Sequence, residues 1–192
     1  GYSTRALLTY NREQIKAAPW KIKEWDFYQV SNDDYCLQLT IGHVSYAGEV
    51  SVKLFEFETG KRIDYGKMLV LPFNRLNMPR SAEQGDLEYQ TEGLLMKFQV
   101  FPGGRRLICQ VAGGKGPSID IDVELVQPDL TSIVMATPFD EDERYFYYNH
   151  KVNCMPASGY AKIDGQEYRF DSRSRIASSS RYISLSKWAR RS

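Results

Sequence analysis

The strictest pattern in the sequence is an alternation of apolar and polar residues over positions 118–126. Every second residue, from Ile119 to Leu125, is aliphatic, and the residues between them are polar or acidic. Successive side chains of a strand point to opposite faces, so this period of two predicts a strand with one buried face and one wet face. Such strands are typical of antiparallel sheets, and we do not expect a parallel α/β fold.

Several other segments also have the pattern of strands separated by turns. Polar or glycine-containing turns separate the apolar runs, and Asp164-Gly165 matches a two-residue type I′ hairpin. Short strands at this spacing predict an all-β fold, either an antiparallel barrel or a sandwich. The predicted strands are 21–30, 35–41, 46–58, 86–91, 94–101, 105–111 and 118–126.

One short helix is predicted near the N-terminus, over residues 11–18. Asn11 can cap its first turn and Pro19 ends it. A helix of this length needs packing against the rest of the chain to be stable.

Length and charge indicate one domain with a different tail. The 192 residues suit a single β domain, which we place at 1–171. Residues 172–192 are rich in Ser and Arg, and we expect them to be disordered or unrelated to the domain. A basic arm for nucleic acid or membrane is the weaker alternative. The rest of the chain carries no basic surplus, so we expect no nucleic-acid partner.

The cysteines and histidines argue for a reducing compartment and against a metal centre. Cys36, Cys109 and Cys154 are odd in number and far apart, which predicts free thiols and a cytoplasmic protein. We expect Cys154 to be a small buried side chain. The two histidines and three cysteines show no metal-ligand spacing, so no metal or cofactor is expected. No apolar run is long enough for a membrane span, and no signal peptide is visible after Gly1.

The segment 144–159 is the most distinctive part of the chain. Interpreted as a strand, it has one face from Phe146 to Cys154 that resembles core. The opposite face is either an ordinary outer surface or a row of ligand-binding groups inside a barrel. The candidate ligand-binding residues on that face are Tyr145, Tyr147, Asn149, Lys151 and Asn153.

A second candidate lies in the segment 71–79, which two prolines mark as a loop or an edge. Arg75 and Asn77 are its candidate ligand-binding residues, because rigid loops often carry function. The alternative is a loop that only connects two strands.

Four segments together resemble a bacterial family known as domain of unknown function 2804. They are RALLTYNREQIKA at the start, IKEWDFYQV at 22–30, residues 71–90 and residues 136–171. The sharpest element is the string FYYN-x-K-x-N-C-M-P-A-x-G from Phe146 to Gly159. The family has no established activity. Its remote similarity to lipocalin-like two-barrel proteins, including carotenoid hydratases, implies a lipocalin-like barrel that holds an apolar small molecule.

The resemblance ends at Asp171, where the family continues with a Gly- and Trp-rich run and a second half. We therefore expect a truncated chain with an open sheet edge, through which copies can associate.

Three functions follow as hypotheses. The first is binding of an apolar or amphipathic small molecule. The second is a hydratase or isomerase that needs the second half, and the third is a fragment that only assembles with another chain. No catalytic pair of residues is recognisable in the sequence.

Overall fold

The chain folds into two antiparallel β-sheets. The computed structural model describes residues 1–7, 10–44, 46–70, 72, 76–114, 116–127, 132–140, 142–171 and 176–185. Sheet A has eight strands, in the order β1 (Tyr2–Ser3), β10 (Ile133–Phe139), β11 (Asp142–Met155), β14 (Ile176–Leu185), β2 (Ile22–Ser31), β3 (Tyr35–His43), β4 (Ala47–Glu56) and β5 (Arg62–Val70). Sheet B has six, in the order β13 (Gln166–Phe170), β12 (Ala157–Ile163), β9 (Ser118–Val126), β8 (Gly104–Ala112), β7 (Leu94–Phe101) and β6 (Leu87–Thr91).

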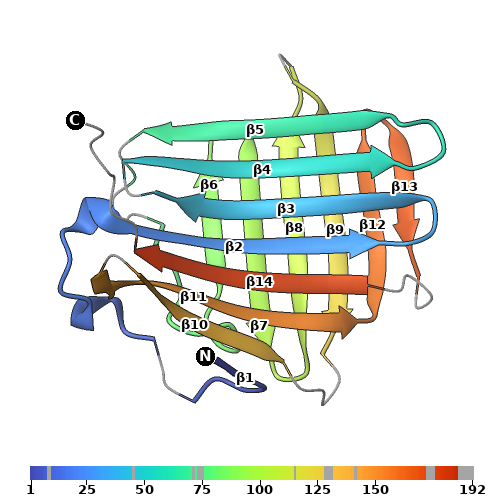
Figure 1. The fold of residues 1–192 in the computed structure, drawn as a ribbon. Helices are drawn as coiled ribbons and strands as arrows, with labels where there is room; N and C mark the ends of the chain where they lie inside the picture. The colour runs from blue at the N-terminus through green and yellow to red at the C-terminus, as the bar shows by residue number, and fades with distance from the viewer. Residues whose placement is uncertain are drawn as a thin grey trace.

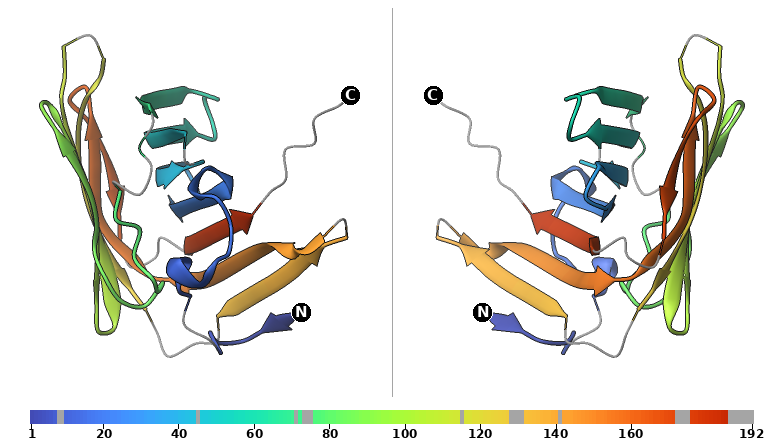
Figure 2. Two further views of the ribbon diagram at one scale, coloured as in Figure 1. Left: turned by 90° about the vertical axis from the view of Figure 1, so that its left-hand side faces the viewer. Right: turned by 90° about the vertical axis from the view of Figure 1, so that its right-hand side faces the viewer.

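The two sheets pack face to face with their strands crossed. Figure 1 shows sheet A in front with its strands running across those of sheet B, and Figure 2 shows the two layers from the side. The apolar core fills the space between them, and fully buried residues such as Leu39, Met96 and Ile121 come from both sheets. This is the crossed arrangement of a β-sandwich.

The predicted alternation is confirmed where it is strictest. On β9, Ile119 to Leu125 are buried at every second position and Ser118 and Glu124 are exposed. The hairpin at Asp164-Gly165 is also confirmed, because both residues have positive φ, of 49° and 86°, as a type I′ turn requires.

The structure selects one of the two folds that the sequence left open and corrects one predicted element. Of barrel and sandwich, the described strands form the sandwich, since none of their pairings closes a sheet into a barrel. The helix predicted over 11–18 is wrong. Asn11 does cap a turn, with its Oδ1 accepting from the Glu13 amide, but only a 3-10 turn forms at Arg12–Gln14. A second 3-10 turn follows at Pro19–Lys21, and no described helix is long and apolar enough to cross a membrane.

Part of the expected tail forms a strand. Residues 176–185 make β14, which pairs with β11 on one side and with β2 on the other. Residues 172–175 and 186–192 lie outside the described residues. The domain boundary at residue 171 stays a prediction.

The chain passes from sheet A to sheet B at the end of β11. The pairing of β11 with β14 shifts register between Val152 and Met155, and Cys154 has a φ of 60°. This irregularity turns the Cys154 side chain outward, so the prediction that it is buried is wrong. After Pro156 the chain enters β12, whose Gly159 lies against the β9 backbone.

Gly159 tests how tightly β12 packs on β9. Its φ is +134°, and a Cβ there would lie 2.1 Å from the Asp122 carbonyl oxygen. We expect Gly159→Ala to lower the free energy of unfolding by more than about 3 kcal/mol, because backbone must move in addition to the strained φ. Urea unfolding followed by circular dichroism measures the loss.

The control is Gly103→Ala, which has a φ of +82° but no atom within 4 Å of the added Cβ. It carries the backbone penalty alone, about 1 kcal/mol. Equal losses in the two variants would contradict the predicted clash.

Candidate functional site

The inner face of β2 carries acidic residues where apolar ones are expected. Burial alternates along the whole strand, and its inward positions include Glu24 and Asp26, which are 3% and 7% exposed. A buried carboxylate is unfavourable unless other groups neutralise it and hydrogen bond to it. The surroundings of Glu24 are therefore a candidate functional site.

Three side chains surround the Glu24 carboxylate. Tyr10 donates its hydroxyl hydrogen to Oε1 at 2.7 Å, and Arg12 forms an ion pair with Oε2. The Nε2 atom of His43 lies 3.2 Å from the same Oε2. His43 stands directly opposite Glu24 in the β2–β3 register, so the sheet itself sets this contact.

One nitrogen of the Arg12 guanidinium, Nη2, donates no hydrogen bond to the described residues. Burial lowers the pKa of Arg12 from its usual range, but a guanidinium remains protonated in proteins. Its Nη1 faces Glu24, whereas its Nη2 is buried and has no hydrogen-bond acceptor among the described residues. A buried donor of this kind needs an acceptor, from a ligand or a water molecule.

The histidine at this site is neutral at physiological pH. Burial, together with the positive charge of Arg12, lowers the pKa of His43 to about 4. The Arg12 charge already balances Glu24, so the carboxylate gives a proton on His43 little further stabilisation.

These residues line a cavity that we call the end cleft, at one end of the sandwich. One part has a volume of about 200 Å³ and is lined by the Glu24 group together with Asn77, Met78 and Arg80. An adjoining part of about 240 Å³ includes Tyr148 and His150 of β11 and shares two lining residues with the first, Tyr10 and Arg80. The cleft therefore combines polar groups with an apolar side.

Another arginine, which is fully buried, fixes the loop that forms one wall of the end cleft. Arg105 of β8 is fully buried and donates from Nη2 to the Ala82 carbonyl oxygen at 2.6 Å. Its Nη1 donates to Gln127 Oε1 at 2.7 Å. The loop residues Arg80 to Gln84 that line the cleft are thus attached to sheet B.

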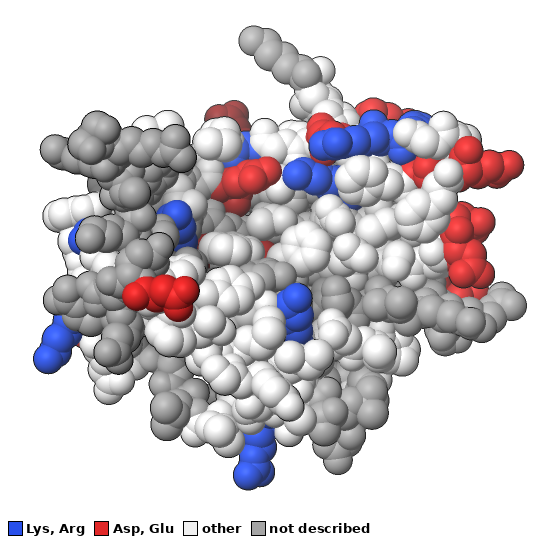
Figure 3. All heavy atoms as spheres, in the orientation of Figure 1, with Lys and Arg blue, Asp and Glu red and all other residues white. Residues whose placement is uncertain are grey.

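The predicted ligand-binding residues fall in different places. Asn77 lines the end cleft, and Arg75 lies outside the described residues. The β11 residues Tyr145, Tyr147, Asn149 and Lys151 share the outer face of sheet A, since their neighbours across β14 include the outward-facing Trp25. Asn153 lies within the register shift between Val152 and Met155 and is half-buried. Figure 3 views this outer face and shows few charged groups over its middle.

Asn149 is unusual among these outer-face residues. It is fully buried, and its Nδ2 donates to the Tyr147 hydroxyl at 3.0 Å. Its Oδ1 has no hydrogen-bond partner among the described residues. Nearby, Lys21 Nζ donates to the Tyr145 hydroxyl at 3.3 Å. Whether the β11 residues contact a ligand stays a prediction.

Sequence reasoning missed the central group of the end cleft. Tyr10, Arg12, Glu24 and His43 belong to no local motif, because their proximity depends on the pairing of β2 with β3 and on the course of the N-terminal segment. One signal was present, since a period of two places Glu24 and Asp26 on the same face as the apolar Ile22 and Val30. A charged residue at a core position often marks a functional site.

Three comparisons relate the chain to other proteins. The family described as a domain of unknown function (DUF2804) matches residues 1–179, and no curated protein matches the chain. An AttH-like protein from Nitrosomonas europaea has a similar structure, with a TM-score of 0.62 and 13% identity over 97% of this chain and 59% of that one. Kievitone hydratase from Nectria haematococca has a TM-score of 0.43 and 9% identity, over 92% and 53%.

The likeness to the AttH-like protein, at 13% identity, shows the fold alone. The chain spans less than two thirds of the length of either solved structure. The family match reaches residue 179, whereas we expected the resemblance to end at Asp171.

The low pKa of His43 predicts how stability depends on pH. The folded-state pKa of about 4 lies below the usual 6.5, so the unfolded chain binds a proton first as pH falls. The contribution of neutral His43 to the free energy of unfolding is complete above pH 6.5. As pH falls from 6.5 to 4 this contribution is lost, and the loss is about 3 kcal/mol at most. We expect His43→Gln to flatten the stability curve in that window.

Proton NMR of the imidazole measures the titration directly. The His43 ring should stay neutral at pH 5. A midpoint near pH 6.5 would contradict the proposed effect of burial and of Arg12.

Proposed function

This chain belongs to the DUF2804 family, and we propose that it binds a small amphipathic molecule in the end cleft. The observation that carries the proposal is the buried Nη2 of Arg12, which lines the cleft and has no acceptor among the described residues. An oxygen atom of a bound molecule would satisfy this donor. Hydrogen bonds from charged donors are among the stronger ones in proteins.

The charges around the end cleft indicate a neutral ligand. Arg12 is paired with Glu24, and Arg80 is paired with Glu13 at 3.0 Å. Since each cation has its own carboxylate, the cleft gives little advantage to a second anion. A carbonyl or hydroxyl oxygen suits Arg12 better, because it accepts a hydrogen bond without adding charge.

The apolar side of the cleft would hold the rest of the ligand. Ala6, Leu7 and Tyr148 line the part that adjoins the Glu24 group. The space between the sheets is filled by core side chains, so we place the ligand at the end of the sandwich rather than at its centre. Two adjoining cavities of about 200 and 240 Å³ suit a molecule of one or two rings.

Two naphthalenes of nearly equal shape test the role of the oxygen. 2-Acetylnaphthalene has a carbonyl, and 2-ethylnaphthalene has the same ring system without one. We expect the ketone to bind about tenfold more tightly, because only it accepts a hydrogen bond from Arg12. Ligand fluorescence in an equilibrium titration measures both dissociation constants.

The variant for this test removes both members of the ion pair. Arg12→Gln with Glu24→Gln avoids leaving a buried charge unpaired, and it should abolish the preference for the ketone. The matched control is Arg106→Gln with Asp122→Asn, which removes an ion pair on the outside of sheet B. A preference that survives in the first variant would sink the assignment to Arg12.

The β11 residues provide a separate test of where the ligand lies. We expect Lys151→Ala with Asn153→Ala to leave binding of 2-acetylnaphthalene unchanged, because neither residue lines the end cleft. Native mass spectrometry of the protein as purified should show the same small-molecule adduct with and without these changes. Loss of the adduct would instead favour the β11 face as the binding site.

An acid–base enzyme is the second candidate, and the Glu24 group favours it. A neutral imidazole and a tyrosine hydroxyl each lie within hydrogen-bonding distance of the Glu24 carboxylate, beside a cavity. Groups of this kind move protons in hydratases and isomerases. The test is exchange of the methyl protons of 2-acetylnaphthalene with D2O. A faster exchange with the unchanged protein than with the His43→Gln variant would favour catalysis over binding alone.

Two further expectations remain proposals. The three cysteines are free, and Cys154 is exposed, which suits a reducing compartment such as the cytoplasm. Strand β5 lies at an edge of sheet A and exposes Met68 and Val70, so copies of the chain can associate along it. Concentration-dependent sedimentation would reveal that association.

A further inference from the structure

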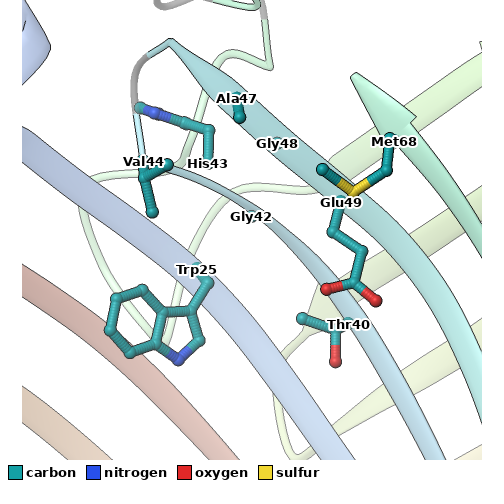
Figure 4. A pocket seen from close by; sticks show the side chains of 9 residues that line it. All are labelled: Trp25, Thr40, Gly42, His43, Val44, Ala47, Gly48, Glu49 and Met68. Atoms are coloured by element: carbon teal, nitrogen blue, oxygen red, sulfur yellow. The ribbon is translucent and has the colours of Figure 1, made fainter. Parts of the chain in front are cut away.

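The outer face of sheet A contains a second groove, which shares one lining residue, His43, with the end cleft. It has a volume of about 340 Å³ and a mainly apolar lining. Figure 4 shows Trp25 on one side of it and Glu49 with Met68 on the other, with Gly42 between them. None of these four residues lines the end cleft.

The groove follows from one row of paired residues. Trp25 pairs with Gly42, Gly42 with Glu49, and Glu49 with Met68, across four neighbouring strands. Neighbouring strands are about 4.8 Å apart, so the backbones of Trp25 and Glu49 are separated by about 10 Å. The residue between them has no side chain, which leaves the floor of the groove open.

Glycine is required at position 42. A Cβ there would lie 2.2 Å from the Cβ of Trp25 and 3.0 Å from the Glu24 carbonyl oxygen. Any other residue would displace the tryptophan or the strand. The close pairing of β2 with β3 therefore requires glycine at position 42, and this glycine leaves the groove open.

The two sides of the groove differ in chemistry. Trp25 offers an aromatic ring with a negative π face, and Met68 adds a polarisable thioether that is 69% exposed. Glu49 is exposed, and no basic side chain of the described residues forms an ion pair with it. Among the described residues, Glu49 therefore gives the groove a negative charge that no basic side chain pairs with.

We propose that this groove binds a small organic cation with an apolar body, such as an amine or a quaternary ammonium compound that carries an aromatic ring. The carboxylate of Glu49 attracts the positive group, and the indole of Trp25 contacts it or the ring beside it. A neutral molecule of the same shape loses the attraction to Glu49, and an anion is repelled. The residues that carry this binding, Trp25, Glu49 and Met68, do not line the end cleft.

A fluorescence titration with matched probes tests the proposal. The chain has three tryptophans, Trp20, Trp25 and Trp188, so Trp20→Phe with Trp188→Phe leaves Trp25 as the reporter. The probes are benzyltrimethylammonium, neutral benzyl alcohol and anionic phenylacetate. We expect saturable quenching by the cation, with a dissociation constant about tenfold lower than for benzyl alcohol and higher at 1 M salt.

Variants assign the binding to the groove. Glu49→Gln, at an exposed position, should weaken cation binding about five- to tenfold, whereas Glu124→Gln on the exposed face of sheet B should not change it. The variant Arg12→Gln with Glu24→Gln should also leave it unchanged, which separates the groove from the end cleft. The proposal is overturned if benzyl alcohol binds as tightly as the cation, if Glu49→Gln has no effect, or if quenching does not saturate.

Discussion

The burial of one carboxylate shapes the end of the sandwich where we place the function. Glu24 points inward from β2, where an unpaired negative charge would be prohibitively unfavourable. It is compatible with the fold because Arg12 and Tyr10 come from the N-terminal segment to meet it, and because His43 stands opposite. An otherwise irregular segment is thereby held against the sheet, and a cavity forms beside it.

The opposite wall of the end cleft is held in a similar way. Residues 76–86, before β6, form no helix or strand, yet Arg105 attaches them to sheet B through the Ala82 carbonyl. Residues 10–21 and 76–86 are therefore each fixed by an arginine guanidinium, and that of Arg105 is fully buried. This arrangement gives a rigid frame to a site made largely of loops, which is what selective binding of a small molecule needs.

Much of the fold was predictable because its signals are local. The period of two over 118–126 and the Asp164-Gly165 turn depend on neighbouring residues only, and both predictions are confirmed. The choice between barrel and sandwich depends on which distant edges pair, so the sequence left it open. The N-terminal helix failed because the segment is too short to pack as a helix, and Arg12 is instead engaged by Glu24. The end cleft could not be predicted because its residues come from positions as far apart as 6 and 150.

The place of β14 in sheet A has a consequence for how the chain reaches its final structure. This strand lies between β11 and β2, although it follows both in sequence by many residues. During synthesis on a ribosome, β2 to β5 can pair early, but they cannot join β10 and β11 until residues 176–185 have emerged. Two strand edges that are paired in the finished protein are exposed until then, and such edges attract other chains. We therefore expect the nascent chain to rely on chaperones, or on slow translation, more than its modest size alone would suggest.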